Sequence, residues 1–483
     1  MSSAPERSEC LKSLQVEPGK FSPGFSPERK AYALHAVQDA ECVRVTAAAE
    51  APDATVLVNG TSVPGGEASP PIPVQVGRNV IRVAAAPPDG GVETVYTVKV
   101  IRPWPAPNWV RTAESAPWSP RDSAGELVFH GRMWIFGGYT PGLVSDVWST
   151  ADGANWSKAG AIPSEAGINI PVTFSYDDRM WVSSQDGKFY SSPDGNTWTL
   201  VTDSAPWAGR YAAGAAVFAG RMWVLGGMKG GEIFNDVWSS ADGARWTLEA
   251  AQAPWSRRQL FGMAAVHAGR LWVLGGGITV YHPFKAYRDV WSSPDGRTWT
   301  KVTDCAPWLA RIWGSSAVYR DRLWVFSGFR AEPTWNNFDD VWYSSDGADW
   351  RRLETETVWS PRHEVSPYVY DDKLWVIGGN AWPLMNDAWR LEIGGMTFVT
   401  QPIIEEFVTA RYVYRAHADF NKSGGAVRYR LAEGPDWLTI DPDTGTLEGT
   451  APAVGEAKVA IEAFDQAGEA ARQSYVLHVI PVG

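Results

Sequence analysis

The sequence has little cysteine, no long apolar run and no excess of positive charge. Only three of its 483 residues are cysteine, too few for a disulfide framework, so at most one bridge could form, with Cys10–Cys42 as the favoured pair. No stretch of 18 apolar residues occurs, which argues against a transmembrane helix. With 43 Lys and Arg against 54 Asp and Glu, the net charge of −11 disfavours nucleic acid as a partner.

The start of the chain also lacks an apolar segment. Residues 1–15 are polar, whereas a secretory signal contains an apolar stretch near its middle. The sequence as written therefore predicts a cytoplasmic protein. A secreted or cell-surface location is the alternative.

Tryptophan is abundant instead, and most of the 27 tryptophans recur at regular intervals. Each repeat begins with a three-residue motif: Arg or Lys, then Met or Leu, then Trp. A second motif such as Asp-Val-Trp follows, and usually a Ser-rich segment with Asp-Gly at its centre. Asp-Gly between segments of alternating apolar and polar residues predicts a tight hairpin, because glycine accepts the positive φ of the turn. One repeat therefore predicts four short antiparallel strands, a to d, which form a propeller blade. The first motifs end at Trp134, Trp181, Trp223, Trp272, Trp324 and Trp375.

The last repeat predicts how the ring closes, because it lacks the Asp-Gly hairpin and its tryptophan. In four other repeats the hairpin tryptophan precedes another tryptophan by nine residues, and Trp109 precedes Trp118 by the same spacing. We therefore expect residues 108–113 to supply the outer strand of the last of six blades. Such an exchange removes two exposed sheet edges.

These repeats resemble the kelch repeat over residues 107–393, on the Arg near the repeat start, the apolar strand ending in Gly-Gly and the following Asn-Asp-Val-Trp. The resemblance is to the central domain of galactose oxidase. Residues 10–103, with VLVNG, GRNVIRV and VYTVKVIRP, resemble the bacterial cadherin-like β-sandwich family. Residues 400–481, with DWLTIDPDTGTLEGTAP, resemble a bacterial Ig/cadherin-like module. Sandwich modules of these families usually occur in exported proteins, in conflict with the missing signal.

The resemblance implies an all-β protein: a six-bladed kelch-type β-propeller with N- and C-terminal β-sandwich domains. It implies little about activity, because kelch propellers include both binding modules and unrelated enzymes.

Binding is expected on the face of the propeller that carries the b–c and d–a connections. The a–b and c–d turns are tight, whereas the b–c segments are long and irregular, as in GITVYHPFKAYR and FRAEPTWNNFD. Variable loops on a rigid scaffold are where binding usually resides. Aromatic residues that the repeat does not explain gather there, and their rings could stack on sugars or apolar ligands, or else pack the loops together. The main ones are Trp313, Trp335, Trp382 and Tyr281, with Tyr139, Phe234, Phe284 and Tyr287 nearby.

A repeated arginine follows the d–a tryptophan by three residues in five of the six blades. One interpretation is a positive funnel at the channel mouth that binds a carboxylate, phosphate or sulfate. The other is structural, with each guanidinium bonded to neighbouring carbonyl or carboxylate groups. The residues are Arg121, Arg210, Arg258, Arg311 and Arg362.

Residues for catalysis are few. Among the seven histidines only His282 and His363 fall on the expected binding face. The best catalytic candidate is His363 or Glu364 as an acid–base partner to the repeated arginines, as would suit a kelch sugar mutarotase or a lyase. The two histidines belong to separate blades without ligand spacing, so neither a metal site nor a cofactor is predicted. The crosslinked cysteine of galactose-oxidase-like sites is not carried over, because Cys305 occupies a slot that holds Ser or Gln in other repeats.

The leading prediction is a monomeric binding protein that recognises a carbohydrate, an acidic small molecule or a peptide at this face, with His282 among the contacts. An enzyme that uses the same opening is the alternative. A purely structural scaffold is the third possibility.

Overall fold

The computed structural model describes residues 10–19, 21, 24–35, 42–74, 77–88, 92–102, 107–281, 284–331, 334–353, 355 and 357–482. Every named element in them is a β-strand. These residues contain no helix with the length and apolar character that crossing a membrane requires. The chain divides into two compact units, Pro107–Ile393 and the combination of Met1–Ala106 with Gly394–Gly483.

The N-terminal part of the second unit is a pair of sheets with strand orders β1-β3-β6 and β2-β8-β7-β4-β5. Alternating side chains of β3, such as Val43 and Val45, are buried in a shared core, as a pleated strand with one covered face requires. The three cysteine thiols are free, so the one bridge that the sequence allowed, Cys10–Cys42, is not formed. The strands are β1 (Leu11–Glu17), β2 (Ala31–His35), β3 (Cys42–Ala49), β4 (Thr55–Val58), β5 (Thr61–Val63), β6 (Ile72–Pro73), β7 (Gly77–Ala86) and β8 (Thr94–Arg102).

The C-terminal part contains sheets of order β36-β43-β42-β39 and β37-β41-β40 and a short β35–β38 pair. Tyr412, Tyr475 and Leu477 lie in its core, and the hydroxyls of the two tyrosines are hydrogen-bonded to each other at 2.8 Å. The strands are β35 (Thr397–Phe398), β36 (Glu405–Phe407), β37 (Arg411–Arg415), β38 (Ala418–Asp419), β39 (Arg428–Glu433), β40 (Leu438–Ile440), β41 (Thr446–Thr450), β42 (Gly455–Phe464) and β43 (Ala470–Ile480).

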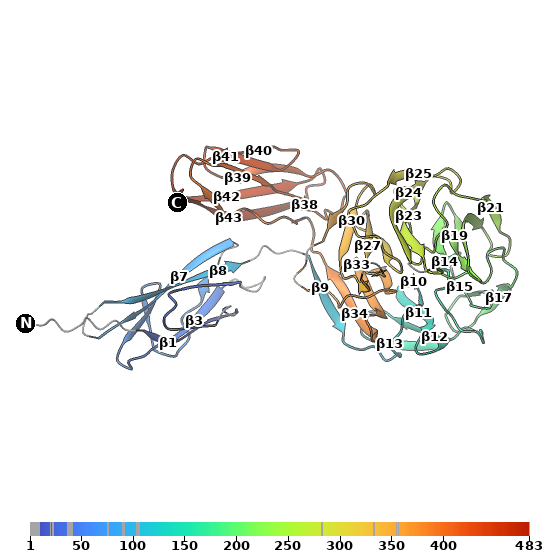
Figure 1. Ribbon diagram of the computed structural model, residues 1–483, viewed down its shortest axis with the longest axis horizontal. Helices are drawn as coiled ribbons and strands as arrows, with labels where there is room; N and C mark the ends of the chain where they lie inside the picture. Colours follow the sequence, from blue (N-terminus) through green and yellow to red (C-terminus); the bar gives the residue numbers. More distant parts are fainter. Residues whose placement is uncertain are drawn as a thin grey trace, which may run out of the picture. The chain divides into compact units, whose positions relative to one another are not determined.

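The described residues of the unit Pro107–Ile393 form six four-stranded antiparallel sheets and one short two-stranded pair, β28 (Phe329–Arg330) with β29 (Asn336–Asn337). Their first strands, β10, β14, β18, β22, β26 and β32, contact one another in a closed circle, so the sheets radiate from a common axis (Figure 1). This arrangement is a β-propeller, and the sheets are called first to sixth below.

The strand bounds follow the repeats of the sequence. The first sheet contains β10 (Gly125–Phe129), β11 (Arg132–Tyr139), β12 (Leu143–Thr150) and β13 (Trp156–Ala161), and the second contains β14 (Thr173–Tyr176), β15 (Arg179–Ser183), β16 (Phe189–Ser192) and β17 (Thr199–Thr202). The third contains β18 (Gly214–Phe218), β19 (Arg221–Lys229), β20 (Glu232–Ser240) and β21 (Thr247–Ala250), and the fourth β22 (Ala264–His267), β23 (Arg270–Ile278), β24 (Lys285–Ser293) and β25 (Thr300–Thr303). The fifth contains β26 (Ser315–Tyr319), β27 (Arg322–Phe326), β30 (Val341–Ser344) and β31 (Arg351–Arg352), and the sixth β32 (Ser366–Tyr370), β33 (Lys373–Asn380), β34 (Leu384–Glu392) and β9 (Asn108–Ala113).

The outer strand of the sixth sheet comes from the start of the propeller. Strand β9 pairs antiparallel with β34, with Trp109 opposite Leu391, and Figure 1 shows the two side by side. The indole of Trp109 lies edge-on to that of Trp359, with ring centroids 4.3 Å apart and an interplanar angle of 87°. Similar perpendicular pairs join Trp118 with Trp156 and Trp308 with Trp350. Trp109 therefore takes the place of the hairpin tryptophan that the sixth repeat lacks.

Neighbouring sheets are joined where the glycine of an Asp-Gly turn packs on the strand-b tryptophan of the preceding sheet. A Cβ atom added to Gly296 of the fourth sheet would lie 2.1 Å from the Trp223 ring of the third. Only glycine fits there, and its φ of +72° also belongs to the left-handed region. The same contact joins Gly153 with Trp375, Gly195 with Trp134, Gly243 with Trp181 and Gly347 with Trp272.

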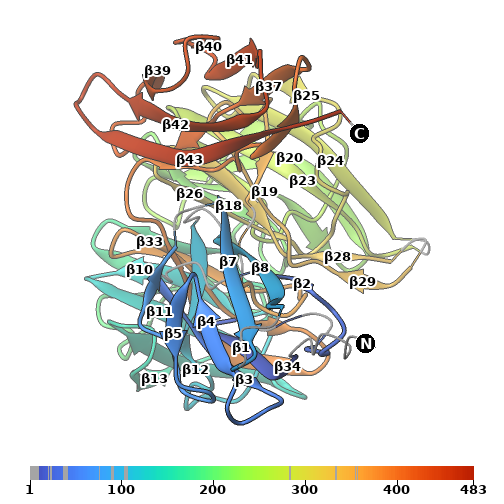
Figure 2. The same ribbon diagram turned by 90° about the vertical axis from the view of Figure 1, so that its left-hand side faces the viewer.

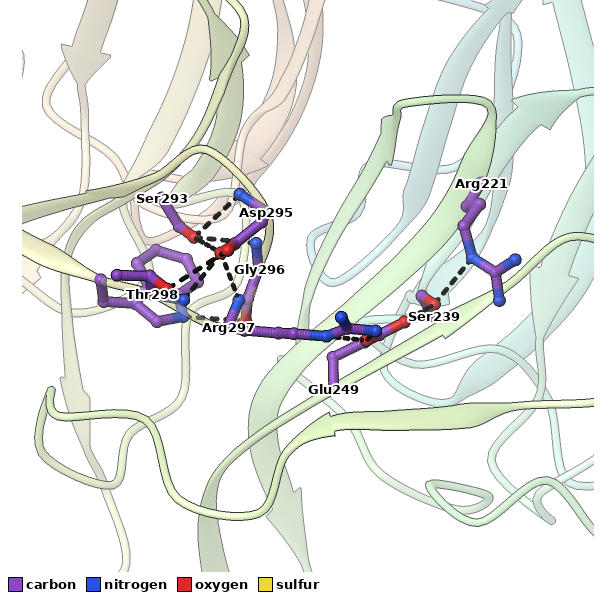
Figure 3. A network of polar contacts seen from close by, with 9 residues as sticks. Arg221, Ser239, Glu249, Ser293, Asp295, Gly296, Arg297 and Thr298 are labelled. Carbon is purple, nitrogen blue, oxygen red and sulfur yellow. Dashed lines mark hydrogen bonds and ion pairs between the residues drawn. The ribbon is translucent and has the colours of Figure 1, made fainter.

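Polar contacts reinforce the same junction, as Figure 3 shows between the third and fourth sheets. The Arg297 Nε atom donates to Glu249 at 2.7 Å, and Ser239 donates to the other oxygen of that carboxylate at 2.6 Å. Arg221 in turn donates to the Ser239 hydroxyl at 2.8 Å. Asp295 accepts the backbone N–H groups of Arg297 and Thr298, so hydrogen bonds within the turn also hold its conformation.

The turn glycines provide a stability test. We expect Gly296→Ala to lower the free energy of unfolding by about 3 kcal/mol, because backbone strain and overlap with Trp223 add together. The control is Gly220→Ala, because Gly220 has a similar φ of +69° but no atom within 4 Å of its added Cβ, and should cost about 1 kcal/mol. Denaturant unfolding followed by tryptophan fluorescence measures both. Equal losses would contradict the proposed packing.

Candidate functional site

The five repeated arginines are held by a repeated carboxylate. Arg311 donates from both terminal nitrogens to Asp340, at 2.7 and 2.9 Å, from Nη1 to the Ser327 carbonyl at 2.8 Å, and from Nε to the Leu309 carbonyl at 3.0 Å. The Trp342 indole donates to the same Asp340 at 2.7 Å. The Asp-Val-Trp motif therefore supplies both the aspartate that accepts from the arginine and the tryptophan that donates a further hydrogen bond to this aspartate. The equivalent ion pairs are Arg121–Asp146, Arg210–Asp236, Arg258–Asp289 and Arg362–Asp387.

These pairs leave little for an external anion. The arginine side chains are almost completely buried, and aromatic rings lie beside several of them: Phe234 at Arg210 and Tyr287 at Arg258. Burial alone would raise the pKa of Asp340, but the hydrogen bonds and charge of Arg311 hold that pKa below its ordinary value. The geometry favours the structural interpretation of the arginine ring over a positive funnel.

In each sheet one non-glycine residue with positive φ lies near the end of the d–a connection, two or three residues before the inner strand begins. Such residues cost about 1 to 3 kcal/mol each and gather at functional sites. Backbone hydrogen bonds link several consecutive members, for example Ile170 N–H to the Ser123 carbonyl at 2.8 Å and Glu364 N–H to the Trp313 carbonyl at 3.0 Å. We call these six residues the mouth ring: Ser123, Ile170, Ala212, Phe261, Trp313 and Glu364.

The mouth ring has two unlike halves. Ile170, Ala212 and Phe261 form an apolar cluster with Tyr211. The other half, Trp313, Glu364 and Ser123, carries an indole, a carboxyl and a hydroxyl. Polar chemistry is therefore concentrated at the fifth, sixth and first sheets.

The b–c connections differ from the long loops that the sequence suggested. In the first sheet β11 and β12 are separated by residues 140–142 alone, and in the third β19 and β20 by residues 230–231. The paired strands bend at a bulge beside a glycine pair, such as Gly137 and Gly138 with φ of +55° and +103°. Beyond the bulge the two strands remain paired as a hairpin. The expectation of long loops is wrong in these sheets. Their variable residues stand on hairpins instead.

Five aromatic rings converge beside the polar half of the mouth ring. Phe329 of β28 (Phe329–Arg330) is fully buried at their centre, stacked on Trp313 with ring centroids 5.4 Å apart. Trp335 and Trp382 each lie edge-on to Phe329, at 5.5 and 5.4 Å. His363 stacks on Trp313 at 5.1 Å. We call Trp313, Phe329, Trp335, His363 and Trp382 the aromatic cluster.

Two members of the aromatic cluster are unusually exposed. Trp335 retains 63% of its accessible surface and Trp382 retains 53%, whereas Phe329 beneath them retains none. Trp335 precedes β29 (Asn336–Asn337), which pairs with β28 in the hairpin that projects in Figure 2. Tyr281 is 67% exposed and lies outside the cluster, and the predicted contact His282 lies outside the described residues.

His363 is held in the cluster by polar neighbours. Its Nδ1 atom lies 2.7 Å from the Oδ1 atom of Asn337, whose amide nitrogen donates to the Asn380 carbonyl at 2.9 Å. Asn337 Oδ1 can only accept, so Nδ1 carries the proton and Nε2 of the neutral ring is left as an acceptor. Burial lowers the pKa of His363 to about 4, so the ring is neutral at pH 7.

Asp122 and Glu364 form a carboxyl pair bridged by Ser123. The Ser123 hydroxyl lies 2.5 Å from Glu364 and 3.1 Å from Asp122. Burial, with the charge of Asp122 adding to it, raises the pKa of Glu364 to about 8, and burial also raises the pKa of Asp122. Glu364 is therefore mostly protonated at neutral pH.

Asn380 links the carboxyl pair to the aromatic cluster. Its amide nitrogen donates to Asp122 at 2.9 Å, and its Oδ1 accepts the backbone N–H of Trp382 at 2.9 Å. Its backbone exchanges hydrogen bonds with His363. One asparagine thus fixes the carboxylate, the histidine and the exposed indole relative to one another.

The central channel forms a cavity of about 240 Å³. Small side chains such as Ala124, Ala213 and Ala264 line it, together with the mouth-ring residues Ile170 and Phe261. Glu126 also lines it, and burial raises the pKa of this carboxyl to about 8. The Glu126 carboxyl is therefore mostly neutral at pH 7 and adds little negative charge to the cavity.

The structure brings His363, Glu364, Trp313 and Trp382 together, but Asn337, Asn380, Ser123 and Phe329 were missed by sequence reasoning. Their signal was a departure from the repeat. Asn380 occupies the slot that holds Tyr139 in the first sheet and Met228 in the third, each bridged to the residue after the repeated arginine. Among the described residues, no group of three or more His, Cys, Asp or Glu could hold a metal ion.

The raised pKa of Glu364 predicts a pH-dependent stability. Below pH 4.5 this carboxyl is protonated in both states, and between about 4.5 and 8 it ionises only on unfolding. Stability should therefore fall as pH rises through this window, and Glu364→Gln should reduce the slope, because the amide mimics the neutral acid. Thermal unfolding from pH 4.5 to 9 measures it, with Glu232→Gln at an exposed carboxyl as the control. Parallel curves for wild type and Glu364→Gln would contradict the raised pKa.

Comparisons with known proteins agree with this architecture. A cadherin-like β-sandwich domain model matches residues 11–103, and the He_PIG family of Ig domains matches residues 400–480. No curated protein matches the chain. A solved structure titled "Structure of YjhT" is similar over 57% of this chain and 95% of its own, with 14% sequence identity and a TM-score of 0.47. The DUF6242 β-propeller domain model matches residues 108–401, more than half of the sequence, and the chain therefore belongs to the DUF6242 β-propeller family.

Proposed function

We propose that the six sheets form a kelch-type propeller whose mouth binds a carbohydrate through the aromatic cluster. The observation that carries the proposal is the pair of exposed indoles, Trp335 and Trp382, fixed on the buried Phe329 ring. Exposing large aromatic rings to water is unfavourable unless a partner covers them. Sugars present apolar C–H faces that stack on indoles.

The surroundings of the indoles support a sugar over a purely apolar ligand. Asn336 and Asn337 follow Trp335, and Asn380 contacts the backbone of Trp382, so amide groups border the rings. Binding sites for small polar ligands combine an apolar surface with a few placed hydrogen-bonding groups. The cadherin-like and Ig domains would suit a secreted or cell-surface protein, where glycans are abundant.

The test is binding to a glycan array, followed by calorimetry with the best glycan. We expect Trp335→Ala and Trp382→Ala each to weaken binding roughly tenfold, because each removes one stacking surface. Phe407→Ala, at an exposed ring in the C-terminal domain, is the matched control and should leave the affinity unchanged. If both tryptophan variants bind like wild type, the aromatic cluster is not the binding surface.

A second candidate function is acid–base chemistry at the same mouth. It is favoured by the neutral His363, whose Nε2 atom has no hydrogen-bond partner among the described residues, near a protonated Glu364. One group that accepts a proton and another that donates one can catalyse the ring opening of a reducing sugar. In that step the anomeric hydroxyl loses its proton, the ring C–O bond breaks and the ring oxygen gains a proton.

Sugar anomer interconversion followed by NMR tests this candidate. The wild-type protein should accelerate interconversion of at least one reducing sugar, and Glu364→Gln should reduce that acceleration by a factor on the order of 100 or more. Glu232→Gln again serves as the control. If the wild-type protein leaves the rates of a broad panel of sugars unchanged, this candidate is wrong.

A further inference from the structure

A second cavity lies between the fourth and fifth sheets and shares only Phe329 with the aromatic cluster. It measures about 170 Å³. Six of its seven lining residues are apolar, and the seventh is Arg330. For comparison, an apolar cavity of about 150 Å³ holds one benzene ring. We call this cavity the Arg330 pocket, lined by Phe284, Ala286, Ala310, Ile312, Phe329, Arg330 and Ala331.

Arg330 differs from the five repeated arginines. Each of those donates to an aspartate, whereas Arg330 forms no ion pair or hydrogen bond through its guanidinium with any described residue. Its Nε atom is buried and has no acceptor. Burying a donor of a charged group without a partner is costly, so this guanidinium is poised for an external acceptor.

The backbone around Arg330 is well fixed. Arg330 lies opposite Asn336 in the β28–β29 pair, and the Phe329 backbone exchanges hydrogen bonds with Ile312 at 2.9 and 3.0 Å. Ile312, Phe329 and Ala331 form a small apolar core against which Phe284 and Trp313 pack. The pocket therefore has a rigid apolar wall beside a single cation.

We propose that the Arg330 pocket binds a carboxylate joined to an apolar group the size of a phenyl ring. A carboxylate accepts two parallel hydrogen bonds from one guanidinium fork, and one negative charge neutralises one positive charge. A phosphate dianion would retain net charge against six apolar residues, which disfavours it. The apolar group would fill the remainder of the cavity.

This inference goes beyond carbohydrate recognition and is independent of it. The residues that carry it, Arg330, Ala286 and Ile312, do not belong to the aromatic cluster. Loss of sugar binding in the Trp382→Ala variant would therefore leave the pocket unchanged. Failure of one proposal does not imply failure of the other.

The probe is 3-phenylpropionate, compared with 3-phenylpropan-1-ol, which has a similar shape without the charge. Ligand-observed NMR titrations of the full-length protein measure both affinities. We expect the acid to bind at least tenfold more tightly than the alcohol, and Arg330→Gln to remove that difference. Ala286→Leu, which fills the cavity, should abolish binding of both compounds. Arg351→Gln, at an exposed arginine of β31, controls for the loss of one positive charge.

The comparison of acid with alcohol on the wild-type protein needs no variant, so a folding defect in Arg330→Gln cannot hide the result. Equal affinities for the two compounds, or binding of the acid that Arg330→Gln leaves within twofold, would overturn the proposal. If the Trp382→Ala variant binds the acid with wild-type affinity, the pocket binds its ligand independently of the aromatic cluster.

Discussion

The buried arginine–aspartate pair is the interaction on which the working face of this propeller depends. In five sheets it joins an arginine of the d–a connection, a few residues before the inner strand, to an aspartate in or directly before the third strand of the same sheet. The tryptophan two residues after that aspartate donates a hydrogen bond to it from a second side. A cation and an anion taken out of water together stabilise little by themselves, but removing one partner typically costs about 3 to 5 kcal/mol. The pair therefore defines where each d–a connection must lie. Five of the six mouth-ring residues follow these arginines by two or three positions, so the pair sets where they lie.

The periodicity of the sequence predicts most of the strand and sheet arrangement, because the same contacts recur in successive repeats. Asp-Gly turns must pack against a tryptophan, and the Asp-Val-Trp motif must accept an arginine, so both leave a regular trace. The spacing of Trp109 and Trp118 pointed to strand exchange, and β9 lies beside β34. By contrast, the sequence does not predict how far the second and third strands of a sheet extend beyond the glycine bulge, because a bent hairpin and an irregular loop have similar compositions.

The candidate site was harder to predict because it is built from exceptions to the repeat. Trp313, Glu364 and Ser123 occupy a slot filled by Ala212 in the third sheet, and nothing local marks them as neighbours. Ser123 meets Glu364 because ring closure places the first and sixth sheets side by side, whereas Trp313 and Glu364 belong to consecutive sheets. Asn380 gained its role only from contacts to Asp122 and Trp382, more than 250 residues apart in sequence from one another. The sequence signal that these residues leave is their difference from the residues at equivalent positions of the other repeats.

Strand exchange at the sixth sheet has a mechanical consequence. Asn108 of β9 lies opposite Glu392 of β34, so the chain enters and leaves the propeller at one end of a single antiparallel ladder. Tension applied through the two flanking domains would load that ladder in the peeling direction, one residue pair after another, rather than shearing all pairs at once. The circle would then open at this seam under modest force while the other five sheets remained intact.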